Sequence, residues 1–500
     1  MSGGQNASQA CRLKRFKGRR VFSYAVLLGI LVLVLIARPA TYAFTTGQGA
    51  SLVLGQSSFT TSTETVSQTG LYGPEGAGFD SHGNLWVADR FDGRVLEFTC
   101  TTTGCTNGNN ATLVLGQPDF TTTGSPVSQA ALGGPEGLGF DSQGNLWVAD
   151  RGFNRVLEYT CTATSSCVNG NTAALVLGQP DFTTDTATTS QTGLRAPVGV
   201  AFDSQGDLWI ADDGNSRVLE YTCTATGSCV NGNAAALVLG QTDFTSRKHA
   251  TSQTGLHAPQ VVVFDSQGNL WVADQDNNRT LEYSPPFSDG MPASLVLGQP
   301  DFTTGIAATS QTGLYRPTGV GFDSQDDLWV ADFDDNRLLE YACTTTGCTN
   351  GNNATLVLGQ PDFATDTAAT SQTELTRPYG VVFDSEGNLW VTDFGNNRVL
   401  EYTSPAASTP TQLNVTVSSV VSPSTQTSAS SISGVSGIIG TFSPITLLLV
   451  GVAVVLVVLL AVVMLRRPKP PPTRSQSTSQ SEHDLLRTMR SPKPRRQAVL

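Results

Sequence analysis

The sequence predicts an all-β fold, a six-bladed β-propeller of four-stranded blades, and three observations support this. A phrase that begins Phe-Asp and continues Gly-Asn-Leu-Trp-Val-Ala-Asp recurs six times with small changes. Its copies begin at Phe79, Phe140, Phe202, Phe264, Phe322 and Phe383. A second phrase, Leu-Val-Leu-Gly-Gln, also recurs six times, at the same spacings of 58 to 62 residues. All six tryptophans share one position of the repeat. Such a period, made of short β-rich runs, is typical of propeller blades.

Each repeat contains four runs of strand length. In the second repeat they are Gly137 to Asp141, Leu146 to Asp150, Arg155 to Tyr159 and Ala174 to Gln179. Apolar or alternating residues bounded by turn formers predict β-strands. The stretch from Asp141 to Asn145 has a glycine where a tight turn needs positive φ, so it predicts the first hairpin of the blade.

The order of the runs predicts how the ring closes. The first Leu-Val-Leu run, at Leu52, precedes the first complete set of three strands, whereas the last set, Gly380 to Tyr402, has no such run after it. We therefore expect the amino-terminal strand to complete the last blade, which removes the two free edges of a linear array.

The repeat resembles the NHL repeat, a motif of six-bladed β-propellers. The resemblance lies in Pro197-Val-Gly-Val-Ala-Phe-Asp203 and in Asp212-Gly-Asn-Ser-Arg217-Val, and its six copies cover about residues 50–403. Among NHL proteins, the sequence is most similar to bacterial exported propellers of the membrane-anchored type. That resemblance implies a sensor, an adhesive or binding protein, or in a few cases an enzyme. It implies the fold more strongly than the activity.

Charge is segregated along the chain. The net charge is −12, but residues 1–20 carry six basic side chains and no acid, and residues 466–500 carry nine basic and two acidic side chains. Residues 44–444 hold 39 acids and 13 bases. Because basic flanks stay in the cytoplasm, both ends are expected inside and the acidic middle outside.

We expect six regions along the chain. They are a basic cytoplasmic N-terminus (1–20), a signal peptide or signal-anchor helix (21–43), the propeller (50–403), a stalk rich in Ser, Thr and Pro (404–444), a transmembrane helix (445–465) and a basic disordered cytoplasmic tail (466–500). The last apolar run has 21 uncharged residues, which suits a bilayer core. Thr41 to Ala43 offers a cleavage site, but whether the first apolar run is cut stays open.

Eight of the nine cysteines form close pairs inside the acidic part, and Cys11 stands alone in the basic segment. The pairs are Cys100/Cys105, Cys161/Cys167, Cys223/Cys229 and Cys343/Cys348. We predict disulfides, as expected for an exported domain, over free thiols or a metal site. The spacing is wrong for zinc, because successive pairs lie on different repeats.

One acidic and one basic residue recur five positions apart in every repeat. The pairs are Asp89/Arg94, Asp150/Arg155, Asp212/Arg217, Asp274/Arg279, Asp332/Arg337 and Asp393/Arg398. Because all six repeats have the pair, we interpret it as structural and assign no catalytic residue to it.

Variable positions flank the proline that opens each innermost strand, and we predict that they surround the mouth of the central channel, where propellers hold ligands. The candidate ligand-binding residues are Tyr72, Glu75, Glu136, Arg195, His257, Gln260, Tyr315 and Tyr379. Ordinary solvated loop positions are the alternative.

We expect a ligand-binding or protein-binding module, of the sensor or adhesive kind, without catalysis and without a cofactor. Glu75, Glu136 and the loops 274–277 and 332–335 offer oxygen ligands for Ca²⁺, but lack the EF-hand pattern. His82, His249 and His257 occupy different phases of the repeat, which argues against zinc. The alternative is a propeller hydrolase, lactonase or lyase with a divalent metal in the channel, and a receptor that signals through the tail is a third. The acidic middle argues against nucleic acid, and leaves the membrane and an unknown extracellular ligand or protein as partners.

Overall fold

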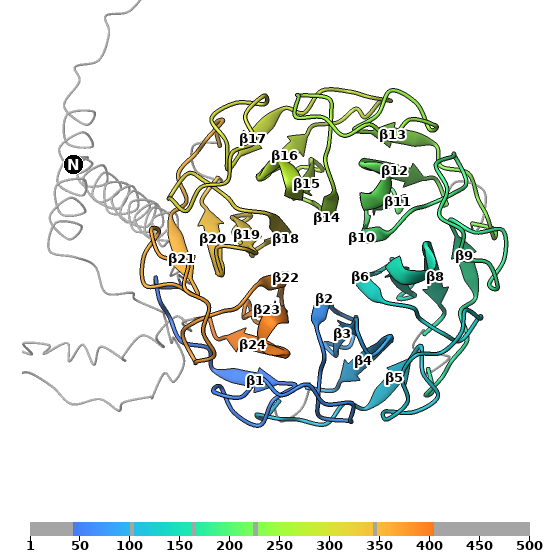
Figure 1. Cartoon of the computed structure of the whole chain (residues 1–500), viewed down its shortest axis with the longest axis horizontal. Helices are drawn as coiled ribbons and strands as arrows, with labels where there is room; N and C mark the ends of the chain where they lie inside the picture. Colours follow the sequence, from blue (N-terminus) through green and yellow to red (C-terminus); the bar gives the residue numbers. More distant parts are fainter. Residues whose placement is uncertain (1–43, 101–104, 162–166, 224–228, 344–347, 405–500) are drawn as a thin grey trace, which may run out of the picture. The chain divides into compact units, whose positions relative to one another are not determined.

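The computed structural model describes residues 44–100, 105–161, 167–223, 229–343 and 348–404. Within these ranges the chain forms six four-stranded antiparallel sheets arranged around a central axis (Figure 1). The innermost strand of every blade lies next to the axis. The all-β six-bladed propeller expected from the repeats is therefore confirmed.

The strands fall at equivalent places in all six blades. Blade 1 contains β2 (Pro74–Phe79), β3 (Leu85–Asp89), β4 (Arg94–Phe98) and β5 (Leu113–Leu115). Blade 2 contains β6 (Pro135–Phe140), β7 (Leu146–Asp150), β8 (Arg155–Tyr159) and β9 (Leu175–Leu177). Blade 3 contains β10 (Pro197–Phe202), β11 (Leu208–Asp212), β12 (Arg217–Tyr221) and β13 (Leu237–Leu239). Blade 4 contains β14 (Pro259–Phe264), β15 (Leu270–Asp274), β16 (Arg279–Tyr283) and β17 (Leu295–Leu297). Blade 5 contains β18 (Pro317–Phe322), β19 (Leu328–Asp332), β20 (Arg337–Tyr341) and β21 (Leu356–Leu358). Blade 6 contains β22 (Pro378–Phe383), β23 (Leu389–Asp393), β24 (Arg398–Tyr402) and β1 (Leu52–Leu54). Single 3₁₀ turns follow the second strand of four blades: η1 (Arg151–Phe153), η2 (Asp213–Asn215), η3 (Gln275–Asn277) and η4 (Phe394–Asn396).

The ring closes as the order of the runs predicts. Strand β1 pairs antiparallel with β24, with Val53 opposite Leu400. The two middle strands of the second blade have the predicted bounds. Its inner strand begins at Pro135, two residues earlier than predicted, and its outer strand, predicted over 174–179, is only three residues long.

The first hairpin of each blade is held by one aspartate. In blade 2, Asp141 Oδ1 accepts hydrogen bonds from the backbone nitrogens of Gln143 and Asn145, at 2.9 and 2.8 Å. Its Oδ2 accepts from Trp147 Nε1 at 3.2 Å. Gly144 has φ +83°, which glycine adopts without strain. The turn and the anchoring of the tryptophan thus depend on the same side chain.

The core consists of six similar clusters between neighbouring blades. In each, the tryptophan of one blade meets the phenylalanine that ends the inner strand of the next, as for Trp147 and Phe202, whose ring centroids lie 5.9 Å apart in an edge-to-face arrangement. The inner strands approach closely beside them. A Cβ on Gly137 would lie 2.1 Å from the carbonyl oxygen of Val198, so only glycine fits there.

In the core cluster between each pair of neighbouring blades, either a disulfide or a second phenylalanine also packs near the tryptophan. In four clusters it is a disulfide, and all four predicted disulfides are present (Cys100–Cys105, Cys161–Cys167, Cys223–Cys229 and Cys343–Cys348). In the other two it is a phenylalanine. Phe287 packs against Trp209 at 4.8 Å, and Phe44 packs against Trp329 at 5.2 Å. The segment before β1 therefore occupies the place that the disulfide segments take elsewhere.

The expected N-terminal basic segment, the signal or anchor helix, the transmembrane helix and the tail lie outside the described residues, as does the stalk beyond Ser404. Cys11 lies there too. Among the residues that the structure describes, no helix has the length and apolarity that crossing a bilayer requires.

Candidate ligand site at the channel mouth

Two ends of the propeller must be distinguished. The mouth end carries the loops between the second and third strands and the loops that enter the next blade, and the hairpin end carries the first hairpins and the disulfide segments. At the mouth end, the recurring Asp and Arg form buried ion pairs with Nε to Oδ2 distances of 2.7 to 2.9 Å.

These pairs fasten the loops of the mouth. Asp150 Oδ1 accepts from the backbone nitrogen of Gly133, and Arg155 donates to the carbonyl oxygens of Ala131 and Phe182, at 2.6 and 2.8 Å. The same pattern occurs in the other five blades. Both side chains of each pair are fully buried, so the structure places them away from any ligand.

A charged cluster closes the centre of the channel. Glu75 (β2) and Glu136 (β6) begin neighbouring inner strands, and both are buried. Arg90, which follows β3, places Nη1 2.6 Å from Glu75 Oε1 and 3.2 Å from Glu136 Oε1. Arg151, at the same position of the next blade, places Nη1 2.9 Å from Glu136 and Nη2 2.8 Å from Asp213. Each guanidinium thus joins two carboxylates.

A hydrogen-bonded tyrosine crosses the axis beside this cluster. The Tyr379 hydroxyl (β22) lies 2.6 Å from Gln260 Oε1 (β14) and 3.2 Å from Glu136 Oε2. These three residues come from alternate blades, and all are buried. The channel is therefore closed at this level by side chains that bond one another.

Burial shifts the pKa of two carboxylates in this cluster. Burial, and then the neighbouring Glu136, raise the pKa of Glu75 well above its ordinary value. Glu75 Oε2 is buried and has no hydrogen-bond partner among the described residues. Burial also raises the pKa of Asp213 to about 6.

The structure divides the eight predicted site residues into two groups. Glu75, Glu136, Gln260 and Tyr379 meet in the channel, but they are buried rather than open to solvent. The other four lie around the rim: Tyr72 against Phe91, Arg195 in the solvent, His257 stacked on His249 and Tyr315 40% exposed.

Three residues of the cluster were not predicted: Arg90, Arg151 and Asp213. They occupy the position directly after the aspartate that ends the second strand. The corresponding residues of blades 4, 5 and 6 are Gln275, Phe333 and Phe394. This position varies among the blades as much as the positions beside the proline do. That variation could have identified these three residues as candidate site residues from the sequence alone.

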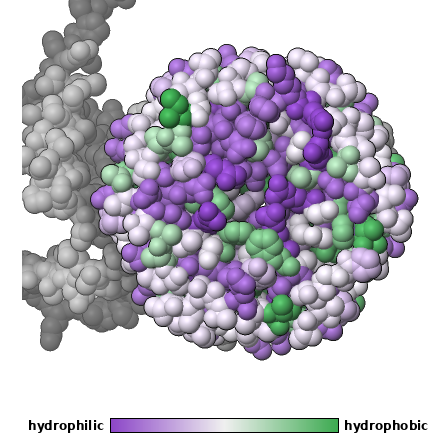
Figure 2. Space-filling model, viewed as in Figure 1, coloured by the Kyte–Doolittle hydropathy of each residue, from purple (hydrophilic) through white to green (hydrophobic). Residues whose placement is uncertain are grey.

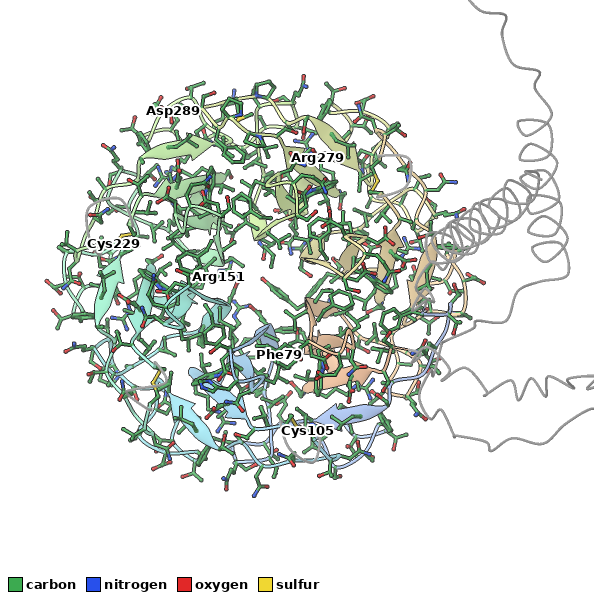
Figure 3. The ribbon with its side chains drawn as sticks, turned by 180° about the vertical axis from the view of Figure 1, so that it is seen from behind. Phe79, Cys105, Arg151, Cys229, Arg279 and Asp289 are labelled. Atoms are coloured by element: carbon green, nitrogen blue, oxygen red, sulfur yellow. A yellow bond between two sulfur atoms is a disulfide. The ribbon has the colours of Figure 1, made fainter. Side chains whose placement is uncertain are left out.

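The two ends of the propeller differ in charge. Outside the six buried pairs, seven basic residues lie in the described chain, all in loops of the mouth end: Arg90, Arg151, Arg195, Arg247, Lys248, Arg316 and Arg377. Figure 2 shows hydrophilic residues gathered around the centre of the ring, and Figure 3 shows Arg151 near the axis, with Cys105, Cys229 and Asp289 toward the rim.

The hairpin end carries carboxylates instead. Two sets lie close enough to hold a hard cation, and each pairs two hairpin aspartates with a strand glutamate: Asp203, Asp207 and Glu220, and Asp323, Asp327 and Glu340. The other four blades have asparagine in place of the second aspartate. Exposed carboxylates often cluster without an ion, so the geometry alone assigns no metal there.

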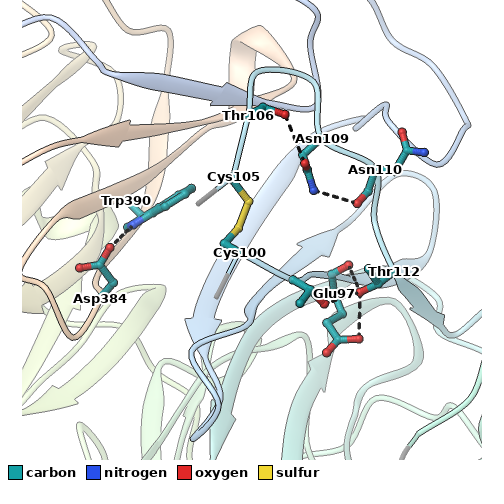
Figure 4. Close-up of a disulfide and its surroundings, with 10 residues drawn as sticks. Glu97, Cys100, Cys105, Thr106, Asn109, Asn110, Thr112, Asp384 and Trp390 are labelled. Carbon is teal, nitrogen blue, oxygen red and sulfur yellow. Dashed lines mark hydrogen bonds between the residues drawn. A yellow bond between two sulfur atoms is a disulfide. The ribbon is translucent and has the colours of Figure 1, made fainter. Parts of the chain in front are cut away.

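A cleft of about 550 Å³ lies at the hairpin end between blades 6 and 1. Figure 4 shows the Cys100–Cys105 disulfide in this region, near Trp390, whose Nε1 donates to Asp384 Oδ2 at 2.9 Å. Asp80, Glu386 and Glu401 complete its acidic lining. The described part of the chain is therefore a propeller with arginine–carboxylate pairs in the channel at its mouth end and acidic clefts at its hairpin end.

Comparison with known proteins agrees with the propeller fold. The family described as SMP-30/Gluconolactonase/LRE-like region matches residues 182–422, which is just under half of the chain. Teneurin-3 of Danio rerio is 22% identical over 293 residues, which cover 51% of this chain and 10% of that protein. The chain thus spans about a tenth of the length of this curated relative. The match is to a lactonase-like propeller, and the NHL type remains a prediction.

Two solved structures are also similar. A catalytically inactive variant of virginiamycin B lyase from Staphylococcus aureus, with quinupristin, is 16% identical, with a TM-score of 0.38 over 67% of this chain and 82% of that one. A protein of unknown function from Bacteroides thetaiotaomicron is 16% identical, with a TM-score of 0.46 over 71% of this chain and 76% of that one.

Proposed function

We propose that this protein is a membrane-anchored, extracytoplasmic propeller that binds a ligand or partner at the mouth of its channel and catalyses no reaction. The observation that carries the proposal is the burial and pairing of the channel carboxylates. Arg90 and Arg151 engage Glu75, Glu136 and Asp213, and all three carboxylates are buried, so a substrate has little access to them.

A resident divalent metal fits this channel poorly. Lactonase-like propellers bind a metal through carboxylate and amide oxygens, and here Glu75, Glu136 and Gln260 are the matching residue types. However, Arg90 Nη1 contacts both carboxylates, so a guanidinium lies where a bridging cation would be bound. Gln260 Oε1 is engaged by Tyr379. A cation would have to displace both interactions.

The four disulfides support an extracytoplasmic location. They close short loops in four of the six blades, and such bonds persist in oxidising compartments. Together with the basic flanks and the apolar run at 445–465, they favour a propeller outside the membrane and a tail inside it.

The second candidate is a metal-dependent propeller hydrolase, lactonase or lyase. The match to the gluconolactonase-like family favours it, and in that case a metal would bind in the channel. Elemental analysis of the full-length protein in detergent, combined with hydrolysis assays on a panel of lactones with and without EDTA, separates the two. We expect no stoichiometric divalent ion in the channel and no turnover.

The hairpin clusters require a matched control. Ion counting is therefore repeated in the Asp207→Asn/Asp327→Asn double variant, which gives blades 3 and 5 the asparagine of the other blades. One divalent ion per chain that survives in this variant, together with lactone hydrolysis that EDTA abolishes and the metal restores, would refute the binding proposal.

A further inference from the structure

The residue before the proline of the inner strand is an arginine in blades 5 and 6 and a small residue in the other four blades, namely Gly73, Gly134, Ala196 and Ala258. In blade 5, Arg316 precedes the proline of the inner strand and reaches back over blade 4, where its Nη2 donates to Gln275 Oε1 at 3.0 Å. Gln275 is 7% exposed under this cover. The residues equivalent to Arg316 in blades 2 and 3 are Gly134 and Ala196.

These small residues leave two guanidinium groups uncovered. A Cβ on Gly134 would lie 3.9 Å from Arg90 Cγ, so this glycine borders Arg90 directly. Its φ of +150° also disfavours a side chain. Arg90 and Arg151 keep 29% and 31% of their side-chain surface exposed, although each is anchored to buried carboxylates.

The two arginines retain unused donors. Arg90 donates only through Nη1, so its Nε and Nη2 have no partner among the described residues. Arg151 donates through Nη1 and Nη2, and its Nε has no partner within the part of the chain that the structure describes. The buried Glu75 Oε2, beside Arg90, is likewise without a partner there. A guanidinium fixed from behind, with free N–H groups in front, is preorganised to bind a planar oxyanion.

An apolar neighbour adds to the site. Phe91 follows Arg90 and is 48% exposed, with its ring 5.3 Å from the Arg90 guanidinium carbon. The Phe91 ring also contacts the rings of Tyr72 and Phe394, so it forms part of an apolar surface beside the guanidinium. An exposed aromatic ring next to paired arginines suits a ligand that joins a carboxylate to an apolar or aromatic body.

We propose that the mouth binds a carboxylate-bearing ligand through Arg90 and Arg151, on the side of blades 1 to 3 where Gly134 and Ala196 leave these two guanidinium groups uncovered. This inference rests on the proposed binding function and adds the chemical class of the ligand.

The test uses the full-length protein and two small probes of similar shape. Benzoate and its neutral counterpart benzamide are titrated by calorimetry at about 0.15 M salt, where long-range charge effects are screened. We expect saturable binding of one benzoate per chain, and association at least tenfold weaker for benzamide.

Three variants locate the site. Arg151→Gln introduces the residue that blade 4 has at this position, and should reduce benzoate association at least tenfold. Ala196→Arg keeps both arginines but supplies the cover seen in blade 5, where Arg316 has a similar φ, and should reduce it as well. Arg377→Gln removes an exposed arginine from another part of the rim and should change nothing. Circular dichroism checks that each variant is folded.

The outcomes are distinct. Loss of benzoate binding in Arg151→Gln and Ala196→Arg but not in Arg377→Gln supports the inference. Equal binding of benzoate and benzamide, an equal loss in Arg377→Gln, or no saturable benzoate binding overturns it. The last result leaves the binding function standing, because that proposal fails only on metal-dependent turnover.

Discussion

At the scale of single residues, repetition and variation separate structural from functional side chains. Asp150 and its five counterparts each accept hydrogen bonds from a backbone N–H and from an arginine. Each arginine also donates to carbonyl oxygens of the loop that enters its blade and of the loop that leaves it. The chain thus repeats a buried network wherever a loop must be fixed. Arg90 and Arg151 break the repeat, and they lie where a ligand can reach them.

Replacing Asp150 by asparagine should destabilise the propeller. The substitution leaves the Arg155 charge buried and uncompensated, and loss of one partner of a buried pair costs about 3–5 kcal/mol. Urea unfolding measures the change in free energy. Asp185→Asn, at an exposed loop position, is the control and should change the free energy by less than about 0.5 kcal/mol. A similar small effect for Asp150→Asn would contradict the structural role.

Unlike the paired Asp and Arg side chains, the buried tyrosines that end the third strand lack hydrogen-bond partners in the described part of the chain. Tyr159, Tyr221, Tyr283, Tyr341 and Tyr402 are fully buried, and their hydroxyls have no partner among the described residues. Blade 1 has Phe98 at this position. The ring therefore supplies the packing, and the hydroxyl contributes a desolvation cost.

Tyr283→Phe should leave the stability unchanged or raise it by about 1 kcal/mol, because it removes an unpaired buried hydroxyl. Tyr283→Leu, which removes the ring as well, serves as the comparison and should destabilise by at least about 2 kcal/mol. Both are measured by urea unfolding. A loss of more than about 1 kcal/mol in Tyr283→Phe would show that the hydroxyl has a stabilising partner.

At the scale of the elements, the sequence predicts the closing strand but not the segment before it. The order of the Leu-Val-Leu runs was enough to place β1 beside β24. The packing of Phe44 could not be predicted from the sequence, because the equivalent segments of four other blades contain a pair of cysteines and no phenylalanine. That a disulfide and a phenylalanine fill the same place beside the tryptophan becomes evident only when the blades are compared in three dimensions.

Closure by β1 predicts a specific pattern of hydrogen exchange. Leu54 is fully buried in the interface of blades 6 and 1, so Leu54→Asp should release β1 and expose the outer edge of β24. Exchange at β24 amides should accelerate at least tenfold, while exchange at the equivalent β16 amides of blade 4 should change much less. Equal acceleration in both strands would indicate global unfolding rather than opening of the ring.

At the scale of the whole molecule, sequence composition indicated the sign of the charge but not its placement. The excess of acids argued against nucleic acid, yet the confinement to one end of the basic residues outside the six repeated pairs depends on which loops the topology brings together. The channel also differs from the expectation of an open mouth. The residues after each proline were predicted to line it, but Tyr379 spans the axis and closes it, which one-dimensional spacing cannot show.

The carboxylates of the hairpin end should make the stability depend on pH. Burial, followed by neighbouring aspartates, raises the pKa of Glu220 and of Glu401 to about 7 from 4.5. A raised pKa in the folded state means that the native protein binds more protons than the unfolded chain between about pH 4.5 and 7. The stabilising contribution of these two protonated carboxyl groups is therefore complete below about pH 4.5 and is lost as the pH rises through about 7.

We expect the Tm to fall from about pH 5 to pH 8, and the Glu220→Gln/Glu401→Gln double variant to show a smaller fall. Aspartates with a lowered pKa, such as Asp243 at about 2, change the stability only at lower pH, so they do not affect the Tm between pH 5 and pH 8. A Tm that stays constant or rises across this range would mean that these carboxylates are solvated as ordinary surface groups.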